Sequence, residues 1–478
     1  MQAHARTRDA TAKGRFASGY EGAGPIGIVV LVRQGMDEFL AFPLMIVAAF
    51  VALAAFTLWL DNTDLSRIRA ARELLGRFVF VTETGTASVL GQLLGGLLTV
   101  ISITFSALLL AVQQTATTLS NQVYSQFLRR RVNQLYFGFF LGLAVYDVAA
   151  LASAHPHFNP VISASTAVVM TTTGLCLLLL LIYSTVDQMR PSVIVQSLRD
   201  HTLRARHRAL ALLSRTRRNV QSSAPVCAEV FADDDGFLQK IRIEPLAAVL
   251  RELGADAEIE ILQPIGAFVA YDERMAVIRA HDAQAARRAV DRVRQSLVLR
   301  GERDLERDAA FGIVQLESIA WTTASSAKST PDAPRMVIHA LRDLLGRWLA
   351  GEPASHAPAA QEAVAVVVRD AIHTDALATL ITIGLASDES RQHVVIAAAM
   401  EALGKLLPRT DGPLRAAMID GIRTLIPAMS DLPLTLELRD ALSDARLALE
   451  AAEVPGVASE IGEAMDAMEA RKGHLRAT

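Results

Sequence analysis

FLAFPLMIVAAFVALAAFTLWL, residues 39–60, is the stretch that decides the fold, because it carries no charge and is closed by Asp61 and Asn62. A helix needs about 20 apolar residues to cross the hydrocarbon core of a bilayer. Three further segments of this kind follow near residues 89–112, 135–154 and 161–183, and the only charge inside them is Asp147. The sequence therefore predicts four transmembrane helices.

The composition fits a protein divided between membrane and water. Over 478 residues the hydrophobic share is 51% and the mean hydropathy is +0.31, an excess that the four segments explain. The 47 Lys and Arg residues nearly balance the 50 Asp and Glu residues, which argues against nucleic acid as a partner. Cys176 and Cys227 are the only cysteines, so a disulfide framework and cysteine-rich zinc sites are excluded.

The placement of Lys and Arg predicts the orientation of the spans. Positive charge is concentrated in residues 1–38, 129–131 and 187–220, whereas residues 153–160 carry none. We therefore expect both termini in the cytoplasm, and no cleavable signal peptide in the polar, basic N-terminal arm. The exception is the basic connection between the first two spans, which is predicted to form an amphipathic helix on the outer bilayer surface near residues 65–79.

The second span is the most polar of the four. Gly91-x-x-x-Gly95 is a spacing at which two helix backbones approach closely. Five polar side chains accompany it, and the first four fall near one helical face: Gln92, Thr99, Ser102, Ser106 and Gln113. This face is interpreted either as the lining of a pore or solute path, or as a set of interhelical hydrogen bonds, because both use the same residue types.

Asp147 lies about 4 Å from the middle of the third span, at 1.5 Å rise per residue. A carboxylate at that depth costs several kcal/mol unless it is paired, hydrated or protonated. The third span has no basic residue three or four positions away, and the candidate hydrogen-bond donors are Thr171–Thr173 and Tyr183 on the fourth span. Asp147 is interpreted either as a cation or proton site, or as a protonated or water-linked acid with a packing role.

The remaining chain reads as a cytosolic α+β region after a transmembrane domain of residues 39–186. A basic juxtamembrane helix, residues 187–220, suits contact with anionic headgroups. A small β-rich domain is expected over residues 221–282, with strands near 236–243, 259–262, 267–271 and 275–278. A helical segment (283–350, with a loop at 321–334), a linker (351–360) and a helical C-terminal domain (361–478, including a helix at 361–383) follow. That last domain suggests a helical-repeat stack, although no strict repeat period is visible.

Sequence motifs of the common catalytic sites are absent. There is no phosphate loop, no G-x-G-x-x-G after a strand, no G-x-S-x-G elbow and no H-E-x-x-H. Asp233–Gly236 resembles part of a calcium loop, but two ligand places would hold Phe231 and Arg242, which favours a solvated turn. His155 and His157 have no third ligand nearby, which favours a surface turn. We therefore expect no cofactor, no metal and no enzymatic activity.

Residues 105–146 resemble the signature of a family of bacterial predicted membrane proteins, catalogued as domain of unknown function 2254 (DUF2254). The family pattern runs F-S-x-T-L-x-A-L-Q, then S-S-Q-F-S-P-R-L-L, then a basic turn into a Gly-rich span. The matching residues are Phe105, Ser106, Leu109, Ala111, Gln113, Ser120, Phe127, Arg131, Gln134, Gly138, Gly142 and Tyr146.

Three later segments extend the resemblance, which covers most of residues 40–350. Residues 235–241 are similar to S-G-Y-V-Q-x-I, residues 265–269 to P-G-D-F-V, and residues 311–320 to F-G-x-x-Q-L-x-x-I-A. The chain departs from the family at four places. Asn121-Gln122 stands where the family has Pro-Arg, Arg130 where it has an acidic residue, and Ser329-Thr330-Pro331 where it has N-D-P. Asp147 stands where the family is usually uncharged. The resemblance implies a multi-pass protein of the bacterial inner membrane and carries no established activity.

Two functions of different kinds fit these observations. The first is an oligomeric channel or transporter for ions or small solutes, supported by the polar second span and Asp147. Four spans are few for a monomeric transporter, so several copies of the chain would be needed. The alternative is a membrane-anchored sensor or scaffold whose cytosolic part binds a protein partner. An enzyme acting on lipid is the weakest of the three readings.

Overall fold

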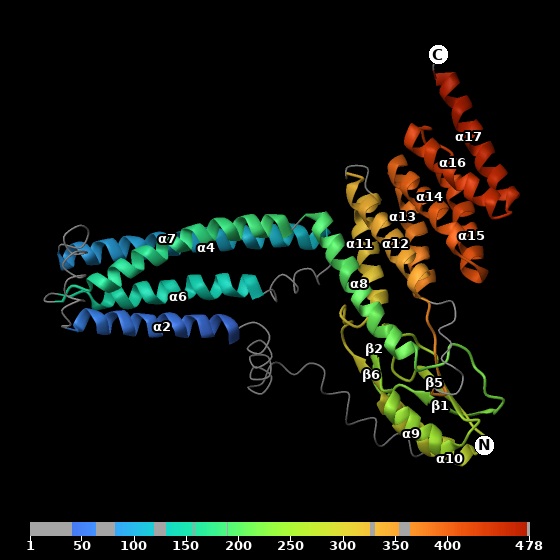
Figure 1. Cartoon of the computed structure of the whole chain (residues 1–478), viewed down its shortest axis with the longest axis horizontal. Coiled ribbons are helices and arrows are strands. Elements are labelled where there is room, and N and C mark those ends of the chain that lie inside the picture. The colour runs from blue at the N-terminus through green and yellow to red at the C-terminus, as the bar shows by residue number, and fades with distance from the viewer. Residues whose placement is uncertain are drawn as a thin grey trace, which may run out of the picture. The chain divides into compact units, whose positions relative to one another are not determined.

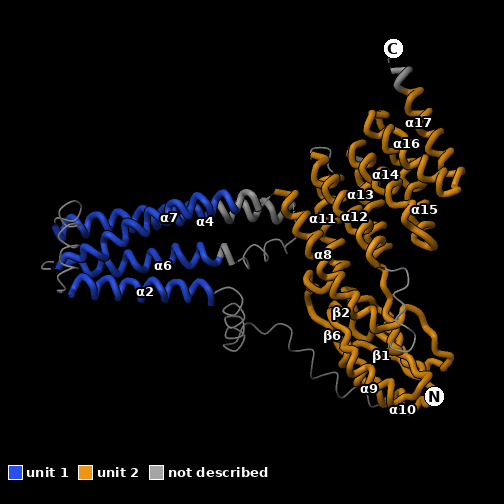
Figure 2. The backbone as a smooth tube through the Cα atoms, in the orientation of Figure 1, with its two compact units in different colours: residues 1–187 blue, residues 188–478 orange. Residues whose placement is uncertain are grey.

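The computed structural model describes residues 41–63, 82–118, 131–155, 158–188, 190–325, 330–352 and 364–475. The chain divides into two compact units, residues 1–187 and 188–478 (Figure 2). Several sequence predictions lie outside the described residues: the N-terminal arm, the amphipathic helix near 65–79, the side chain of Gln113, the departures at 121–122, 130 and 329, His157 and most of the linker 351–360.

Unit 1 is a bundle of helices, and its described part contains α2 (Ala41–Asn62), α4 (Glu83–Thr118), α6 (Arg131–Ser153) and α7 (Val161–Gln188) (Figure 1). All four are long and apolar enough to cross a membrane, within the windows Ala41–Asn62, Glu83–Ser106, Gln134–Ser153 and Val161–Ser184. Among the described residues, each of the four predicted spans therefore corresponds to one of these helices. A single hydrophobic core joins the four helices.

Glycines on α6 set how closely its neighbour α2 approaches. A Cβ atom on Gly142 would lie 2.5 Å from Cδ2 of Phe50, and one on Gly138 would lie 2.9 Å from Cα of Pro43. Real Cβ contacts are never this short, so only glycine permits this packing. On the other side of α6, Leu143 contacts Gly174 of α7. Small residues thus hold the bundle together, as expected where lipid offers no hydrophobic driving force between helices.

The strands of unit 2 form two small sheets. The first has the order β1 (Val226–Phe231), β5 (Arg274–Arg279), β3 (Glu258–Ile261) and β7 (Val366–Val368), with β3 antiparallel to β5 and parallel to β7. The second pairs β2 (Gly236–Ile241) with β4 (Phe268–Val269) and β6 (Leu297–Arg300). Helices α9 (Ile243–Leu253) and α10 (Ala283–Ser296) bury apolar faces in the same core.

The four predicted strands are present, but β1, β6 and β7 are additional, and the last two lie beyond residue 282. Leu297 and Val298 lie within the predicted helical segment 283–350, yet α10 ends at Ser296 and these residues pair with β2. Residues 366–368 were predicted to be helical. Three consecutive valines instead suit a strand, and β3 supplies their hydrogen-bond partners.

Seven helices of unit 2 stack in two layers. One layer holds α11 (Ala309–Ala324), α13 (Ile372–Glu389), α15 (Gly412–Met429) and α17 (Pro455–Leu475), and the other holds α12 (Asp332–Gly351), α14 (His393–Leu406) and α16 (Leu436–Ala451). Successive helices within each layer lie side by side (Figure 1). The predicted loop at 321–334 is shorter than expected, because α11 reaches Ala324 and α12 begins at Asp332.

The predicted juxtamembrane helix is α8 (Pro191–Leu213), and it belongs to unit 2. Pro191 begins this separate helix three residues after the end of α7, so the fourth span does not continue through it. Its apolar stripe packs on α11 and α12. The prediction that its arginines contact headgroups is wrong for Arg206, whose side chain is only 3% exposed and is ion-paired inside unit 2.

Candidate functional site

The polar face of α4 is exposed along unit 1. Gln92, Thr99, Ser102 and Ser106 are all exposed, and no described atom lies within 4 Å of the Cβ positions of Gly91 and Gly95. The packing role predicted for these two glycines therefore has no partner among the described residues of the same chain. It stays a prediction, now for a contact with another molecule.

The hydrogen bonds of this face stay within α4. Thr99 donates to the carbonyl oxygen of Gly95 at 2.8 Å, and Ser106 donates to that of Ser102 at 2.9 Å. The Gln92 amide reaches only the Ser88 hydroxyl, at 3.4 Å. None of these three bonds crosses to another helix. Within one chain, these side chains therefore do not form the predicted interhelical hydrogen bonds.

Asp147 lies inside the bundle and is fully buried. Of the predicted donors, Thr171 contacts it, with 3.5 Å between Oγ1 and Oδ2. Thr172 and Thr173 instead donate to carbonyl oxygens of their own helix at 2.8 Å, and Tyr183 is 71% exposed. No donor in the described part of the chain reaches Oδ1 of Asp147. The exposed α4 face and Asp147 are therefore separate features.

Asp61 is a second buried carboxylate that sequence reasoning used only to end the first span. It accepts hydrogen bonds from the backbone N–H groups of Ile162 and Ser163, both at 2.9 Å, and from the Ser163 hydroxyl at 2.7 Å. It thus caps the N-terminus of α7 from another helix, where the helix dipole favours negative charge. Tyr146 extends the network, since its hydroxyl contacts Thr57 and the Ser163 carbonyl.

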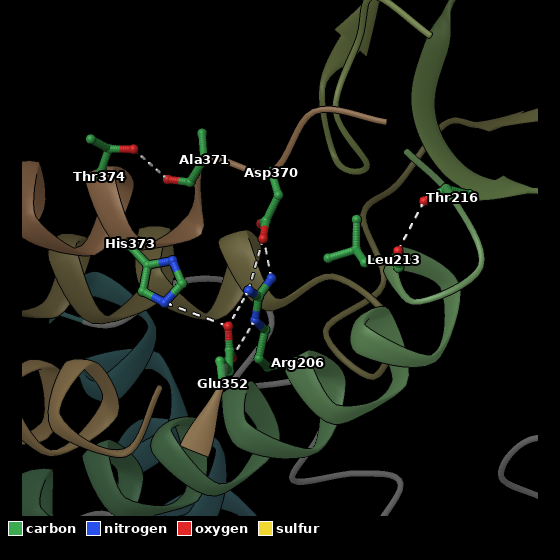
Figure 3. A network of polar contacts seen from close by, with 8 residues as sticks. All are labelled: Arg206, Leu213, Thr216, Glu352, Asp370, Ala371, His373 and Thr374. Atoms are coloured by element: carbon green, nitrogen blue, oxygen red, sulfur yellow. Dashed lines mark hydrogen bonds and ion pairs between the residues drawn. The ribbon is translucent and has the colours of Figure 1, made fainter. Parts of the chain in front are cut away.

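Unit 2 contains a buried ionic network centred on Arg206 (Figure 3). Its guanidinium makes two-pronged hydrogen bonds to Glu352, at 2.8 and 2.5 Å, and to Asp370, both at 2.8 Å. Burial alone would lower the pKa of Arg206, but the hydrogen bonds and charges of Glu352 and Asp370 outweigh it and raise the pKa. Two carboxylates and one guanidinium leave a net negative charge. His373 faces it, with 3.5 Å between its Nε2 and Oε2 of Glu352.

A cavity of about 430 Å³ lies beside this network. Its walls come from α8, from residues 264–267, from residues 303–317 and from residues 368–382. Both signs of charge line it, including Arg206 and Arg303 against Asp308 and Asp370. The sequence did not predict this cavity, because its walls are separated by up to about 175 residues.

Two of the segments that carry the family resemblance meet at this cavity, and a glycine shapes each. Gly266 has φ +89°, and a Cβ atom there would lie 2.1 Å from Oδ2 of Asp308. Asp308 caps α11 through the Phe311 N–H at 3.0 Å and pairs with Arg303 at 2.7 Å. Gly312 lets α8 approach, since a Cβ atom there would lie 2.0 Å from the hydroxyl of Thr202. A side chain at either position would collide with its neighbour, so the structure requires glycine at both.

Among the described residues, no group of three or more His, Cys, Asp or Glu side chains is arranged so that it could hold a metal ion. His155 is exposed, and its Nδ1 lies 2.7 Å from the Ser153 carbonyl oxygen. In the acidic segment 233–236, the Asp234 carboxylate accepts a bond from the next backbone N–H.

Four apolar helices followed by a mixed sheet and a helical stack define a multi-pass membrane protein with a large second unit. The chain belongs to the DUF2254 family of predicted membrane proteins, whose model matches residues 36–405. This confirms the resemblance found in the sequence. The matched region includes the four apolar helices of unit 1, both sheets and the stack as far as α14, while α15, α16 and α17 lie beyond it. No curated protein and no solved structure matches the chain.

Proposed function

We propose that the protein is a homo-oligomeric channel for ions or small solutes in which α4 lines the path. The observation that carries this proposal is the exposed polar face of α4. Its members Ser88, Gln92, Gly95, Thr99, Ser102 and Ser106 are alternately four and three residues apart. That spacing repeats every seven residues, the period with which helices pack around a common axis.

The other exposed surfaces of unit 1 support this assignment by contrast. Large apolar side chains predominate there, including Met45 and Trp59 on α2 and Val169 and Leu179 on α7, and the exposed Thr172 and Thr173 are exceptions. Such surfaces suit lipid. The α4 face instead offers hydroxyls, an amide and bare backbone, which suit water or another protein surface. Most of its side chains are small, so several copies of α4 around an axis leave space between them for a hydrated solute.

Matched threonine variants test the proposal. Thr99 and Thr172 are both exposed, and each donates to a carbonyl of its own helix at 2.8 Å, but only Thr99 lies on the α4 face. In liposomes, Thr99→Leu is expected to lower ion or solute flux by about tenfold or more, a barrier of about 1.4 kcal/mol. Thr172→Leu should leave flux unchanged. Purified protein that is monomeric in detergent, or that passes nothing above the rate of empty liposomes, contradicts the proposal.

The proposed location is the inner membrane of a bacterium, with unit 2 and both termini in the cytoplasm. The charge distribution supports this orientation. It is tested by placing one cysteine at the exposed position His155 in a chain with Cys176→Ala and Cys227→Ala. Labelling of intact cells by an impermeant maleimide is expected. Labelling only after the membrane is opened would reverse the orientation.

A membrane-anchored sensor or scaffold is the second candidate, and the cavity of unit 2 is the observation that favours it. Its mixed charges suit a small polar ligand, and the two-layer helical stack offers an extended surface to a protein partner. This role involves no catalysis. It is tested by affinity capture on immobilised unit 2, and recovery of nothing beyond background from either lysate or metabolite extract would reject it.

A further inference from the structure

The two buried carboxylates of unit 1 are in opposite situations. Asp61 is 2% exposed and accepts three hydrogen bonds at 2.7–2.9 Å, from Ile162 and Ser163. Asp147 is 0% exposed and has one long contact, 3.5 Å, to Thr171. Asp61 therefore has the environment of a carboxylate anion. Asp147 has the environment of a neutral group.

Nothing in the described surroundings offsets a negative charge on Asp147. The ionisable groups on the helices packed around α6 are Asp61 on α2, Glu83 on α4, and Cys176, Tyr183 and Asp187 on α7, and none of these is a cation. On α6 itself the described groups are Tyr136, Tyr146 and Asp147. Arg131, at the start of α6, is about 24 Å away along the helix. An unpaired charge in so apolar a place is neutralised by taking up a proton.

The neighbouring hydroxyl suits the protonated form. Thr172 and Thr173 both direct their hydroxyls to carbonyl oxygens of α7, whereas Thr171 directs its hydroxyl to Asp147. A hydroxyl both donates and accepts, so Thr171 pairs with a carboxylic acid as readily as with a carboxylate. A metal ion would need several oxygen ligands, and only this one contacts Asp147 among the described side chains.

We propose that Asp147 is a proton-binding site inside the membrane unit. One carboxylate oxygen takes a proton from water and forms an O–H bond, and no other bond changes. In the packed bundle Asp147 is the neutral acid. Its deprotonation requires water or a donor to reach Oδ1, and hence a separation of α6 from its neighbours. The site is independent of the exposed α4 face and does not rest on the proposed channel.

Carbodiimide labelling tests the proposal on the intact chain. Dicyclohexylcarbodiimide enters membranes and adds to the O–H of a protonated carboxyl, giving a stable N-acylurea that carries the whole reagent. After labelling at neutral pH and proteolysis, mass spectrometry is expected to find the adduct on the peptide that contains Asp147. The peptide that contains Asp61 should carry none. Labelling of Asp61 equal to or greater than that of Asp147 would overturn the assignment.

Asparagine variants give a second, independent readout. Asp147→Asn is isosteric with the neutral acid, so it should fold normally, lose the adduct and lose the infrared carbonyl band of a protonated carboxyl. As pH rises, the wild type should lose stability in detergent, because the folded chain holds the proton, while Asp147→Asn should lose none by this route. Identical infrared spectra and identical pH profiles of the two proteins would contradict the proposal even if labelling failed for reasons of access.

Discussion

Two arginines on α8 show how burial decides what a charged residue does. Arg206 lies on the apolar stripe that continues from Leu198 and Thr202, and its side chain is 3% exposed. Arg208, two positions on, is 53% exposed and pairs with Glu306 at the surface. The sequence contained a signal for this difference, because an arginine within an apolar stripe of a helix indicates a buried ion pair.

Removal of Arg206 is expected to be strongly destabilising. Arg206→Ala leaves Glu352 and Asp370 buried together without their cation, which costs about 3–5 kcal/mol. Arg208→Ala should cost less than about 1 kcal/mol, because its pair is exposed. Denaturant unfolding of the full-length protein in detergent, followed by tryptophan fluorescence in a Trp59→Phe, Trp321→Phe background that leaves Trp348 beside His373, measures both values. Equal effects of the two substitutions would show that the buried network contributes little.

The same network predicts a loss of stability in acid. Burial lowers the pKa of His373, so the unfolded chain binds its proton first as pH falls through about 6.5. Burial alone would raise the pKa of Asp370, but Arg206 outweighs it and the pKa is lowered, which extends the loss below about pH 4. We expect the unfolding midpoint to fall over both ranges. His373→Asn should weaken the dependence near pH 6, leaving the part due to His339, whose pKa burial also lowers, and should keep that near pH 4.

At the scale of the element, glycines in neighbouring spans have different environments. The Phe50 ring fills the space beside Gly142 on α6, whereas no described atom lies within 4 Å of the Cβ position of Gly91 on α4. The sequence analysis assigned small-residue packing only to Gly91 and Gly95 of α4. The structure finds the packing within the chain at α6, where Gly138 and Gly142 have that same spacing.

These two glycines give opposite expectations for an added methyl group. Gly142→Ala forces Phe50 to move and should cost about 1–3 kcal/mol of unfolding free energy. Gly91→Ala should leave that free energy of the single chain unchanged and, if α4 lies at an interface between copies, weaken the oligomer. Thermal unfolding and size-exclusion chromatography in detergent separate the two effects. A destabilising Gly91→Ala at unchanged oligomeric state would contradict this account.

The elements differ in how far sequence predicts them. The spans were placed correctly because hydropathy is a local property and each window contains the whole signal. The strands β6 and β7 were not, because LVLR and VVV are too short to distinguish a strand from a buried helix, and their partners β2 and β3 lie far away in sequence. The Arg206 network and the cavity depend on the same distant contacts, so they were not predicted either.

For the whole molecule, the boundary between the units decides which part folds alone. Helix α8 belongs to unit 2, where it packs on α11 and α12 and supplies Arg206. A cut before α8 therefore preserves the core of unit 2. A cut after it exposes the apolar face of α11 and leaves two carboxylates without their cation.

Two truncations test this boundary. Residues 190–478 are expected to remain in solution without detergent, with a cooperative unfolding transition. Residues 220–478 should aggregate or unfold at least about 3 kcal/mol more easily, the cost of losing one partner of a buried ion pair. Circular dichroism and gel filtration measure both outcomes. Equal behaviour of the two fragments would show that α8 is dispensable to unit 2.

Strand β7 is synthesised long after the strand with which it pairs. It pairs with β3 but is translated about a hundred residues later, after α11 and α12. At about 5–20 residues per second, a ribosome leaves that edge of β3 without its neighbour for roughly 5–20 seconds. An uncovered strand edge invites pairing with other chains. During this interval the nascent protein is therefore prone to aggregate, and chaperones that cover the edge of β3 would keep it soluble.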